Sequence, residues 1–216
     1  MKRALVIVSL LFFSSVVAFG QAPTPPDDLV RKVTDRIIEL IQKNRAEYAR
    51  DYRKLYEMVD REVLPYFDFA VMARSVLGRH WREASAEQRE RFVKEFRDLL
   101  VRTYAVALLK YTDEQVRILP LRAKPEDKRV LVRTEVISGG GGPNIPIHYS
   151  FYRSDAGWKV YDVAVENVSL VTNYRSVYAE RIRAQGLDAL IATVAEDNRR
   201  GRTSGSAPGE PRATGR

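Results

Sequence analysis

The spacing of apolar residues changes twice along the chain, and this change constrains the fold more than any other feature. Apolar side chains recur at helical spacing over residues 29–111, alternate with period two over residues 116–165, and return to helical spacing over residues 174–198. The turn signal Ser154-Asp155-Ala156-Gly157 joins two alternating segments, so consecutive strands are expected to pair antiparallel. This order predicts an α+β fold, with helices covering a twisted antiparallel sheet of about four strands.

Local signals set the ends of the predicted helices. Asp27 and Asp28 stand where a helix N-cap would, and Asp68 is placed to cap a short helix that Gly78 stops. The run Ser85-Ala86-Glu87-Gln88 has the spacing of a capping box and opens the longest helix. The predicted helices cover residues 29–41, 52–64, 69–77, 86–111, 174–185 and 187–198.

The first twenty residues predict the compartment. Lys2 and Arg3 precede an apolar stretch from Ala4 to Val17, and Ala18-Phe19-Gly20 supplies the small residues of a cleavage site. This order is typical of a secretory signal peptide, and the stretch is shorter than the roughly 20 residues that cross a bilayer. We expect residues 1–20 to be removed and residues 21–198 to form one domain. The chain has no cysteine, which excludes disulfides and a lipid-anchored terminus.

The net charge of +8 does not indicate a nucleic-acid-binding protein. Two of these charges belong to Lys2 and Arg3, and the tail after Asn198 carries a net four, from five arginines and Glu210. The body is left with only about +2, whereas nucleic-acid binders concentrate Lys and Arg on one face. Residues 199–216 lack apolar periodicity and are predicted to form a disordered basic tail.

Few residues could carry catalysis. His80 and His148 lie in different predicted elements and do not pair as metal ligands, and no nucleophile elbow or phosphate-binding loop is present. Glu135 and Asp162 both fall in strands, where a cross-strand ion pair or hydrogen bonds from backbone amides explain them better than acid–base catalysis. We therefore predict a protein that is not an enzyme, with no catalytic residue, no metal and no cofactor.

The strands carry more apolar residues than a sheet with one face in water needs. Successive side chains of a strand point to opposite faces of the sheet, so the consecutive residues Val130 and Leu131 put an apolar side chain on each face. Strict alternation likewise puts Val160 and Val163 on opposite faces. A thick core beneath a helical layer explains this surplus, and so does a cavity between the sheet and the helices. Periodicity alone does not separate these two interpretations.

Six short runs between Tyr66 and Ile191 stand out by their order and spacing. They are Tyr66-Phe67-Asp68-Phe69, Leu77-Gly78-Arg79-His80-Trp81-Arg82, Phe92-x-x-x-Phe96-x-x-Leu99-Leu100-x-x-Thr103-Tyr104, Trp158-Lys159-Val160-Tyr161-Asp162-Val163, Val168-Ser169-Leu170-Val171-x-Asn173-Tyr174-Arg175 and Gly186-Leu187-Asp188-x-Leu190-Ile191. Together these runs resemble the MlaC or toluene-tolerance family of periplasmic phospholipid-binding proteins. Asn167 departs from this family, which typically has glycine before Val168-Ser169-Leu170, but asparagine tolerates a left-handed backbone.

The resemblance implies a cavity between sheet and helices that takes the tails of a phospholipid cargo. It also implies a periplasmic shuttle between an outer-membrane lipoprotein complex and an inner-membrane ABC transporter complex with a lipid-binding substrate domain, which maintains the lipid asymmetry of the outer membrane. We predict that Arg133 and Arg175 stand at the cavity mouth, where guanidinium can hold phosphate. The predicted apolar lipid-binding residues are Phe96, Leu100, Tyr104, Val132, Val136, Ile147, Tyr149, Phe151 and Val160.

Two alternatives remain open. One is a periplasmic interaction module, in which side chains fill the interior and the protein only bridges two membrane complexes. The other is a small-molecule enzyme on a hollow α+β fold, because the predicted architecture resembles nuclear-transport-factor-2-like folds. Related family members carry other lipids, including hopanoids, so the sequence leaves the lipid class open, together with the direction of transport and the oligomeric state.

Overall fold

The structure is a computed structural model that describes residues 24–109, 115–124, 126–137 and 142–201. Helices precede and follow an antiparallel sheet, which confirms the predicted α+β class. The elements are α1 (Pro26–Arg50), α2 (Tyr52–Glu62), the 3-10 helix η1 (Leu64–Tyr66), α3 (Phe69–Leu77), α4 (His80–Glu83), α5 (Ala86–Leu108), β1 (Gln115–Ile118), β2 (Arg129–Ile137), β3 (Ile145–Ser154), β4 (Gly157–Val165), β5 (Val168–Ser169), α6 (Leu170–Gln185) and α7 (Leu187–Arg199).

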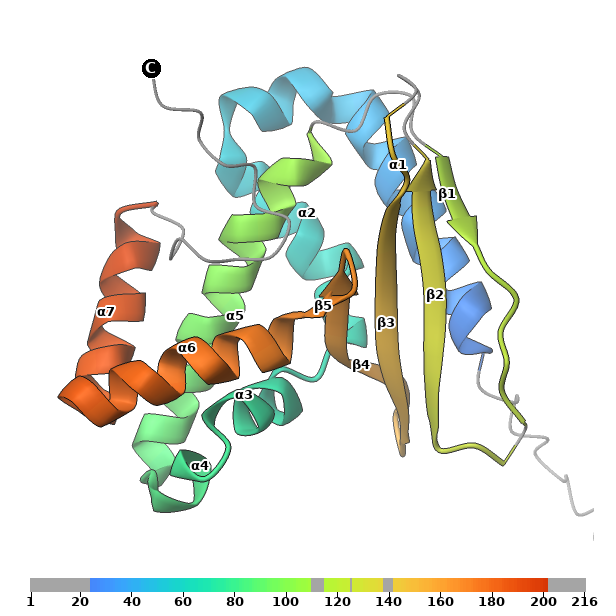
Figure 1. The fold of residues 1–216 in the computed structure, drawn as a ribbon. Helices are drawn as coiled ribbons and strands as arrows, with labels where there is room; N and C mark the ends of the chain where they lie inside the picture. The colour runs from blue at the N-terminus through green and yellow to red at the C-terminus, as the bar shows by residue number, and fades with distance from the viewer. Residues whose placement is uncertain (1–23, 110–114, 125, 138–141, 202–216) are drawn as a thin grey trace, which may run out of the picture.

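The sheet has five strands in the order β1-β2-β3-β4-β5, one more than the approximate count predicted, because the short β5 adds to its edge. Asp155 and Ala156 form the tight turn between β3 and β4, as the turn signal predicts. Helix α1 lies against β1 and β2, whereas α3 and α6 pack against β4 (Figure 1). The two ends of the sheet therefore contact different helices.

A β-bulge reverses the side-chain pattern halfway along β4. Ser150 pairs with Asp162, but the next residue, Phe151, pairs with Val160, which leaves Tyr161 as an extra residue. Because one extra residue moves the following side chains to the other face, Val163 lies on the same face as Val160. The expectation that these two valines lie on opposite faces is wrong, and the bulge accounts for part of the apparent apolar surplus.

Most predicted helix ends are confirmed. The Asp68 carboxylate accepts a hydrogen bond from the Val71 backbone N–H at 2.9 Å and caps α3. The capping box of α5 is complete: Ser85 Oγ accepts from the Gln88 N–H at 3.1 Å, and the Gln88 side chain accepts from the Ser85 N–H at 2.9 Å. Gly78 (φ 56°) follows α3, a conformation that L side chains rarely adopt.

The first helix differs from its prediction at both ends. It begins at Pro26, so Asp27 and Asp28 lie inside its first turn instead of capping it. It continues to Arg50 but bends at Asn44, whose φ of −120° and ψ of 15° are not helical. The Asn44 side-chain amide donates to the Leu40 carbonyl at 3.0 Å, a local hydrogen bond that competes with the helical ladder.

Helix α6 begins at Leu170, earlier than the predicted Tyr174, because two side chains cap it. Ser169 Oγ accepts from the Thr172 N–H at 3.0 Å, and Asp162 Oδ1 accepts from the Val171 N–H at 3.1 Å. The second contact confirms the prediction that Asp162 accepts a hydrogen bond from a backbone amide.

The other strand carboxylate, Glu135, forms an ion pair with Arg117 on the neighbouring strand β1. The predicted cross-strand ion pair is thereby confirmed. The turn before β5 also keeps its shape without glycine, since Asn167 adopts a left-handed φ of 66°.

The predicted tail and signal peptide lie largely outside the described residues. Helix α7 extends through Arg199, and Arg199 and Arg200 both contact the Glu196 carboxylate, so these two arginines belong to the domain and not to a tail. Residues 1–23 and 202–216 are not described, so the signal peptide over residues 1–20 and the disorder of the tail stay predictions. Within the described part of the chain, no helix combines the length and apolarity needed to cross a membrane.

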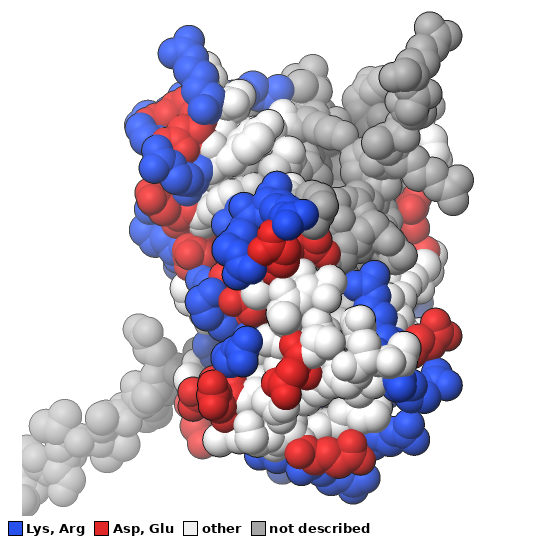
Figure 2. All heavy atoms as spheres, turned by 90° about the vertical axis from the view of Figure 1, so that its left-hand side faces the viewer, with Lys and Arg blue, Asp and Glu red and all other residues white. Residues whose placement is uncertain are grey.

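Charges of both signs are interspersed on the molecular face shown in Figure 2. Ion pairs along the helices also place opposite charges together, as where Lys94 contacts Glu95 and Asp98 on α5. This face of the described chain therefore lacks the continuous basic surface that nucleic-acid binding requires.

Candidate functional site

The candidate site is an apolar cavity of about 620 Å³. It lies between the inner face of the sheet and helices α1, α2 and α5, and residues of η1 and α3 close one part of its wall. Its volume falls within the range of about 300–1,000 Å³ that is typical of small-molecule sites. The predicted cavity between sheet and helices is therefore present in the structure.

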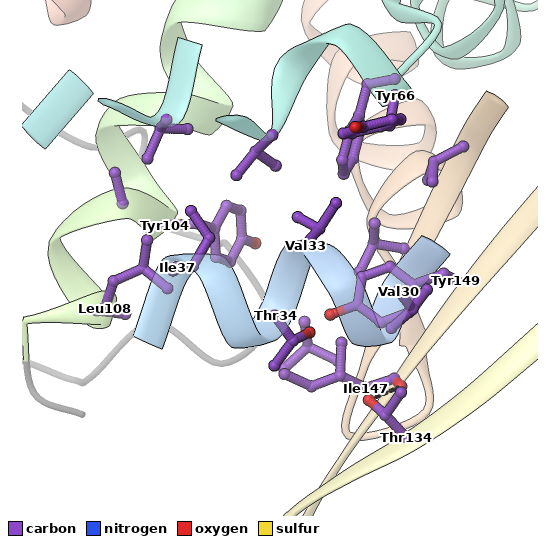
Figure 3. A pocket seen from close by; sticks show the side chains of 18 of the residues that line it. Val30, Val33, Thr34, Ile37, Tyr66, Tyr104, Leu108, Thr134, Ile147 and Tyr149 are labelled. Atoms are coloured by element: carbon purple, nitrogen blue, oxygen red, sulfur yellow. Dashed lines mark hydrogen bonds between the residues drawn. The ribbon is translucent and has the colours of Figure 1, made fainter. Parts of the chain in front are cut away.

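Helix α1 forms one wall of this cavity. Figure 3 shows Val30, Val33, Thr34 and Ile37 of α1 facing the interior, opposite residues of the sheet and of α5. These positions follow the three- and four-residue spacing of a helix face, which explains why one straight segment presents all of them to the same space. The wall is built from the first half of α1, before the bend at Asn44.

The sheet and α5 form the facing walls. From the sheet, side chains that alternate along β2 and β3, and that follow the bulge in β4, reach the cavity. From α5, Leu100, Tyr104 and Leu108 line the cavity, and Figure 3 labels the last two. The sheet residues on the wall are Val116, Thr134, Val136, Ile145, Ile147, Tyr149, Phe151, Val160, Val163 and Val165.

A few polar groups interrupt the apolar lining. Thr134 is fully buried, and its hydroxyl donates to the Ile147 carbonyl at 2.7 Å (Figure 3). Glu166, in the turn after β4, is the only charged residue among the described lining residues. The other polar lining residues are Thr34, Gln42, Tyr66, Tyr104 and Tyr149.

Tyr149 is a lining residue whose pKa is shifted. Burial raises the pKa of its phenol to about 12, although a hydrogen bond with Thr134 partly opposes this shift. The phenol therefore stays neutral near pH 7 and can donate a hydrogen bond. A group with so high a pKa is poorly suited to acid–base catalysis at neutral pH.

Seven of the nine predicted apolar residues line the cavity: Leu100, Tyr104, Val136, Ile147, Tyr149, Phe151 and Val160. The other two, Phe96 and Val132, are buried in the filled core and are not among the lining residues. Contact of any of these residues with a lipid stays a prediction.

The two predicted arginines do not join the cavity lining. Arg133 pairs in register with His148 and alternates with Val132 and Thr134, so its side chain points to the opposite face of the sheet. Arg175 lies on α6, where its Nε donates to the Ser75 carbonyl of α3 at 2.6 Å. Neither arginine therefore lines the cavity, and contact of either one with a lipid phosphate stays a prediction.

The lining residues predicted from the sequence include neither Glu166 nor any residue of α1, although both line the cavity. The apolar spacing of α1 was detectable, but a helix stripe that faces a cavity is indistinguishable from one that faces a core. Glu166 carries no signal of its own in the sequence, except that it precedes Asn167 in the turn that joins β4 to β5.

No group of three or more His, Asp or Glu side chains within the described ranges could hold a metal ion. His80 contacts Glu83 at 3.1 Å, one turn further along α4, a pairing that the sequence analysis overlooked. Neither residue lines the cavity.

The fold and the cavity define the class of this protein: a single α+β domain whose sheet and helices enclose an apolar space. The chain belongs to the MlaC family, since the family model described as "MlaC protein" matches residues 31–196.

Two characterised relatives and one solved structure are similar to this chain. The intermembrane phospholipid transport system binding protein MlaC of Haemophilus influenzae is 28% identical over 172 residues, 79% of this chain and 80% of the relative. The toluene tolerance protein ttg2D of Pseudomonas putida is 26% identical over 189 residues, 87% of this chain and 85% of the relative. A phospholipid-binding protein of Ralstonia solanacearum, solved in complex with a phospholipid, is 28% identical and superposes with a TM-score of 0.75, covering 81% of this chain and 97% of that one.

Proposed function

We propose that this protein is a periplasmic phospholipid carrier that holds acyl chains in its cavity and moves lipid between an outer-membrane lipoprotein complex and an inner-membrane ABC transporter complex. The observation that carries the proposal is the cavity of about 620 Å³ with an almost entirely apolar lining. Support for the cargo comes from the relatives, one named for intermembrane phospholipid transport and one solved with a phospholipid bound.

The physical chemistry of acyl chains fits such a carrier. Each CH₂ group that leaves water for an apolar environment contributes about 0.8 kcal/mol, so a free phospholipid does not cross an aqueous compartment at a useful rate. Moving the same chain from a bilayer into an apolar cavity is nearly neutral, because both environments exclude water. The carrier can therefore load and unload without an energy source of its own, and its partners must set the direction.

The unfilled interior also favours the carrier over a module that only bridges two membrane complexes. A bridging module has no need of an internal cavity, and close packing of its interior would make it more stable. Helix α1 instead lines the cavity with apolar side chains, among them Val33 and Ile37 (Figure 3).

Native mass spectrometry tests the proposal. The mature protein, purified from a periplasm without detergent, should carry a stoichiometric lipid adduct that disappears on denaturation, and an organic extract should contain the same lipid. Filling the cavity by Val136→Trp should lower the adduct while the protein stays folded. A protein that is free of lipid, and that takes up none from vesicles or from its purified partner complexes, would falsify the carrier.

Compartment and cleavage have their own test. N-terminal sequencing of the protein from a periplasmic fraction should give a chain that starts at Gln21. An intact Met1 in the membrane fraction would instead indicate an uncleaved anchor.

A further inference from the structure

Glu166 holds a distinctive position at the edge of the cavity. It is the one charged side chain among the described lining residues, and it is exposed, so it marks a place where the apolar lining meets water. Its backbone N–H donates to the Pro146 carbonyl at 2.9 Å, which ties the turn after β4 to the start of β3. A lipid with its tails in the cavity would pass its polar end through such an edge.

The backbone at this position is unusual for glutamate. Glu166 has a φ of 51° and Asn167 a φ of 66°, and they are the only non-glycine residues with positive φ in the described chain. L side chains rarely adopt this conformation, which persists where the surrounding structure holds it in place. The turn therefore fixes the backbone from which the Glu166 side chain extends at the edge of the cavity.

The charges around the cavity are unbalanced. No ion pair of the described residues includes Glu166, and no arginine or lysine is among the described lining residues. Two arginines of the sheet and of α6 also have partners of their own: Arg117 contacts Glu135 on the far face of the sheet, and Arg175 donates to the Ser75 carbonyl. Among the described lining residues, the only formal charge is therefore the negative charge of Glu166.

We propose that Glu166 selects the headgroup of the cargo and favours phospholipids that carry an ammonium group, such as ethanolamine or choline lipids, over lipids with a net negative charge. This inference rests on the proposed carrier function. An ammonium group can approach the carboxylate and offset the repulsion of the lipid phosphate, whereas a glycerol headgroup leaves two negative charges near each other. At an exposed edge, an ion pair of this kind changes affinity by about 1.5- to 5-fold.

Competition for lipid between headgroups tests the proposal. The mature wild-type protein is incubated with vesicles of equal parts phosphatidylethanolamine and phosphatidylglycerol with the same acyl chains, separated from them, and its bound lipids are quantified by mass spectrometry. The wild type should be enriched in phosphatidylethanolamine by about 1.5- to 5-fold over the vesicle ratio. Glu166→Gln should return the ratio to that of the vesicle, and Glu166→Lys should reverse it.

Asp155→Asn is the matched control. Asp155 is also an exposed carboxylate in a turn of the sheet, but it lies between β3 and β4, away from the lining residues, so its removal should leave the lipid ratio unchanged. Raising the salt concentration should weaken the wild-type preference, because an exposed ion pair is screened. Thermal unfolding of each variant shows whether it is folded.

The outcomes separate the two proposals. If all folded proteins take up lipid at one headgroup ratio, the role of Glu166 is refuted while the carrier stands. If Asp155→Asn shifts the ratio as much as Glu166→Gln does, the preference reflects overall charge, and the specific role is again refuted. If no protein takes up lipid, the carrier itself fails and this inference fails with it.

Discussion

The two ends of α5 have opposite surroundings. Near its start, Phe92 and Phe96 stack with ring centroids 5.6 Å apart, and Phe96 meets Tyr174 of α6 edge-on at 5.3 Å. Near its end, Leu100 and Leu108 face the cavity. One continuous helix therefore contributes both to the filled core and to the wall of the cavity.

The difference shows how a small domain can be stable and still contain a void. The filled part, formed by α3, α5, α6, α7 and the sheet, has the close packing that stabilises the fold. A second cluster, from α1, α2 and the end of α5, includes side chains that line the hollow part, such as Ile37 and Val59. The close packing that stabilises the fold and the cavity therefore lie toward different ends of the same helix.

The largest effect is expected when the same residue type is truncated in the filled core and on the cavity wall. Leu99→Ala removes a side chain with 0% exposure from the filled core and should lower the free energy of unfolding by about 2–5 kcal/mol. Leu108→Ala removes a half-buried side chain from the cavity wall. It should lower the free energy of unfolding by about 1 kcal/mol or less, because this side chain packs against few atoms on its cavity side. Urea unfolding followed by circular dichroism measures both, and equal losses would mean that the cavity is closed in solution.

A second pair adds volume on one strand. Val132 has 1% exposure and lies in the filled core, so Val132→Trp should overpack it and cost about 1–3 kcal/mol. Val136 lies four residues along β2 on the cavity wall, so the indole of Val136→Trp has space to enter. The second variant should keep nearly the wild-type midpoint in thermal unfolding. If the two variants melt together, the distinction between the filled and the hollow part is wrong.

The capping box at the start of α5 gives a smaller effect. Ser85→Ala removes the acceptor for the Gln88 N–H and should lower the free energy of unfolding by about 1 kcal/mol. Ser85→Asp keeps an acceptor at this position and serves as the control. Because this end of α5 belongs to the filled part, lipid uptake per folded molecule should not change, and a loss of uptake in Ser85→Ala would link the two ends.

The smallest effect at neutral pH is expected from Tyr149→Phe, which removes one hydroxyl from the cavity wall. The pKa of this phenol rises from 10.0 to about 12 in the folded protein, so the unfolded chain releases the proton first. The stabilising contribution is complete below pH 10 and disappears as the pH rises through 12. Wild type should therefore lose stability relative to Tyr149→Phe over this interval in urea unfolding, and parallel pH profiles would contradict a buried phenol.

The sequence predicts the fold well because its signals are local. The capping residues Asp68 and Ser85, and the change from helical to alternating spacing, depend on neighbours in the chain and are confirmed. The bulge at Tyr161 could not be predicted, because an extra residue is defined only by the register of β4 against β3. Its effect is nevertheless large, since it decides the face on which Val163 lies.

The site is harder to predict than the fold, for a physical reason. Phe96 and Leu100 lie one turn apart on the same apolar stripe and belong to the same core cluster, yet only Leu100 also lines the cavity. Burial demands an apolar side chain in both places, so the sequence pattern is the same. Arg133 shows the converse: its charge suggested a phosphate contact, but strand alternation turns it away from the cavity.

The bend at Asn44 has a consequence for how the wall opens. The non-helical backbone of Asn44 divides α1 into two segments, and only the segment from Pro26 to the bend lines the cavity. Segments separated in this way can lose and regain their hydrogen bonds as independent cooperative units. Amide protons between Val30 and Ile41 should therefore exchange with deuterium faster than those of α5, and the cavity can admit a long chain through a local opening while the rest of the domain stays folded.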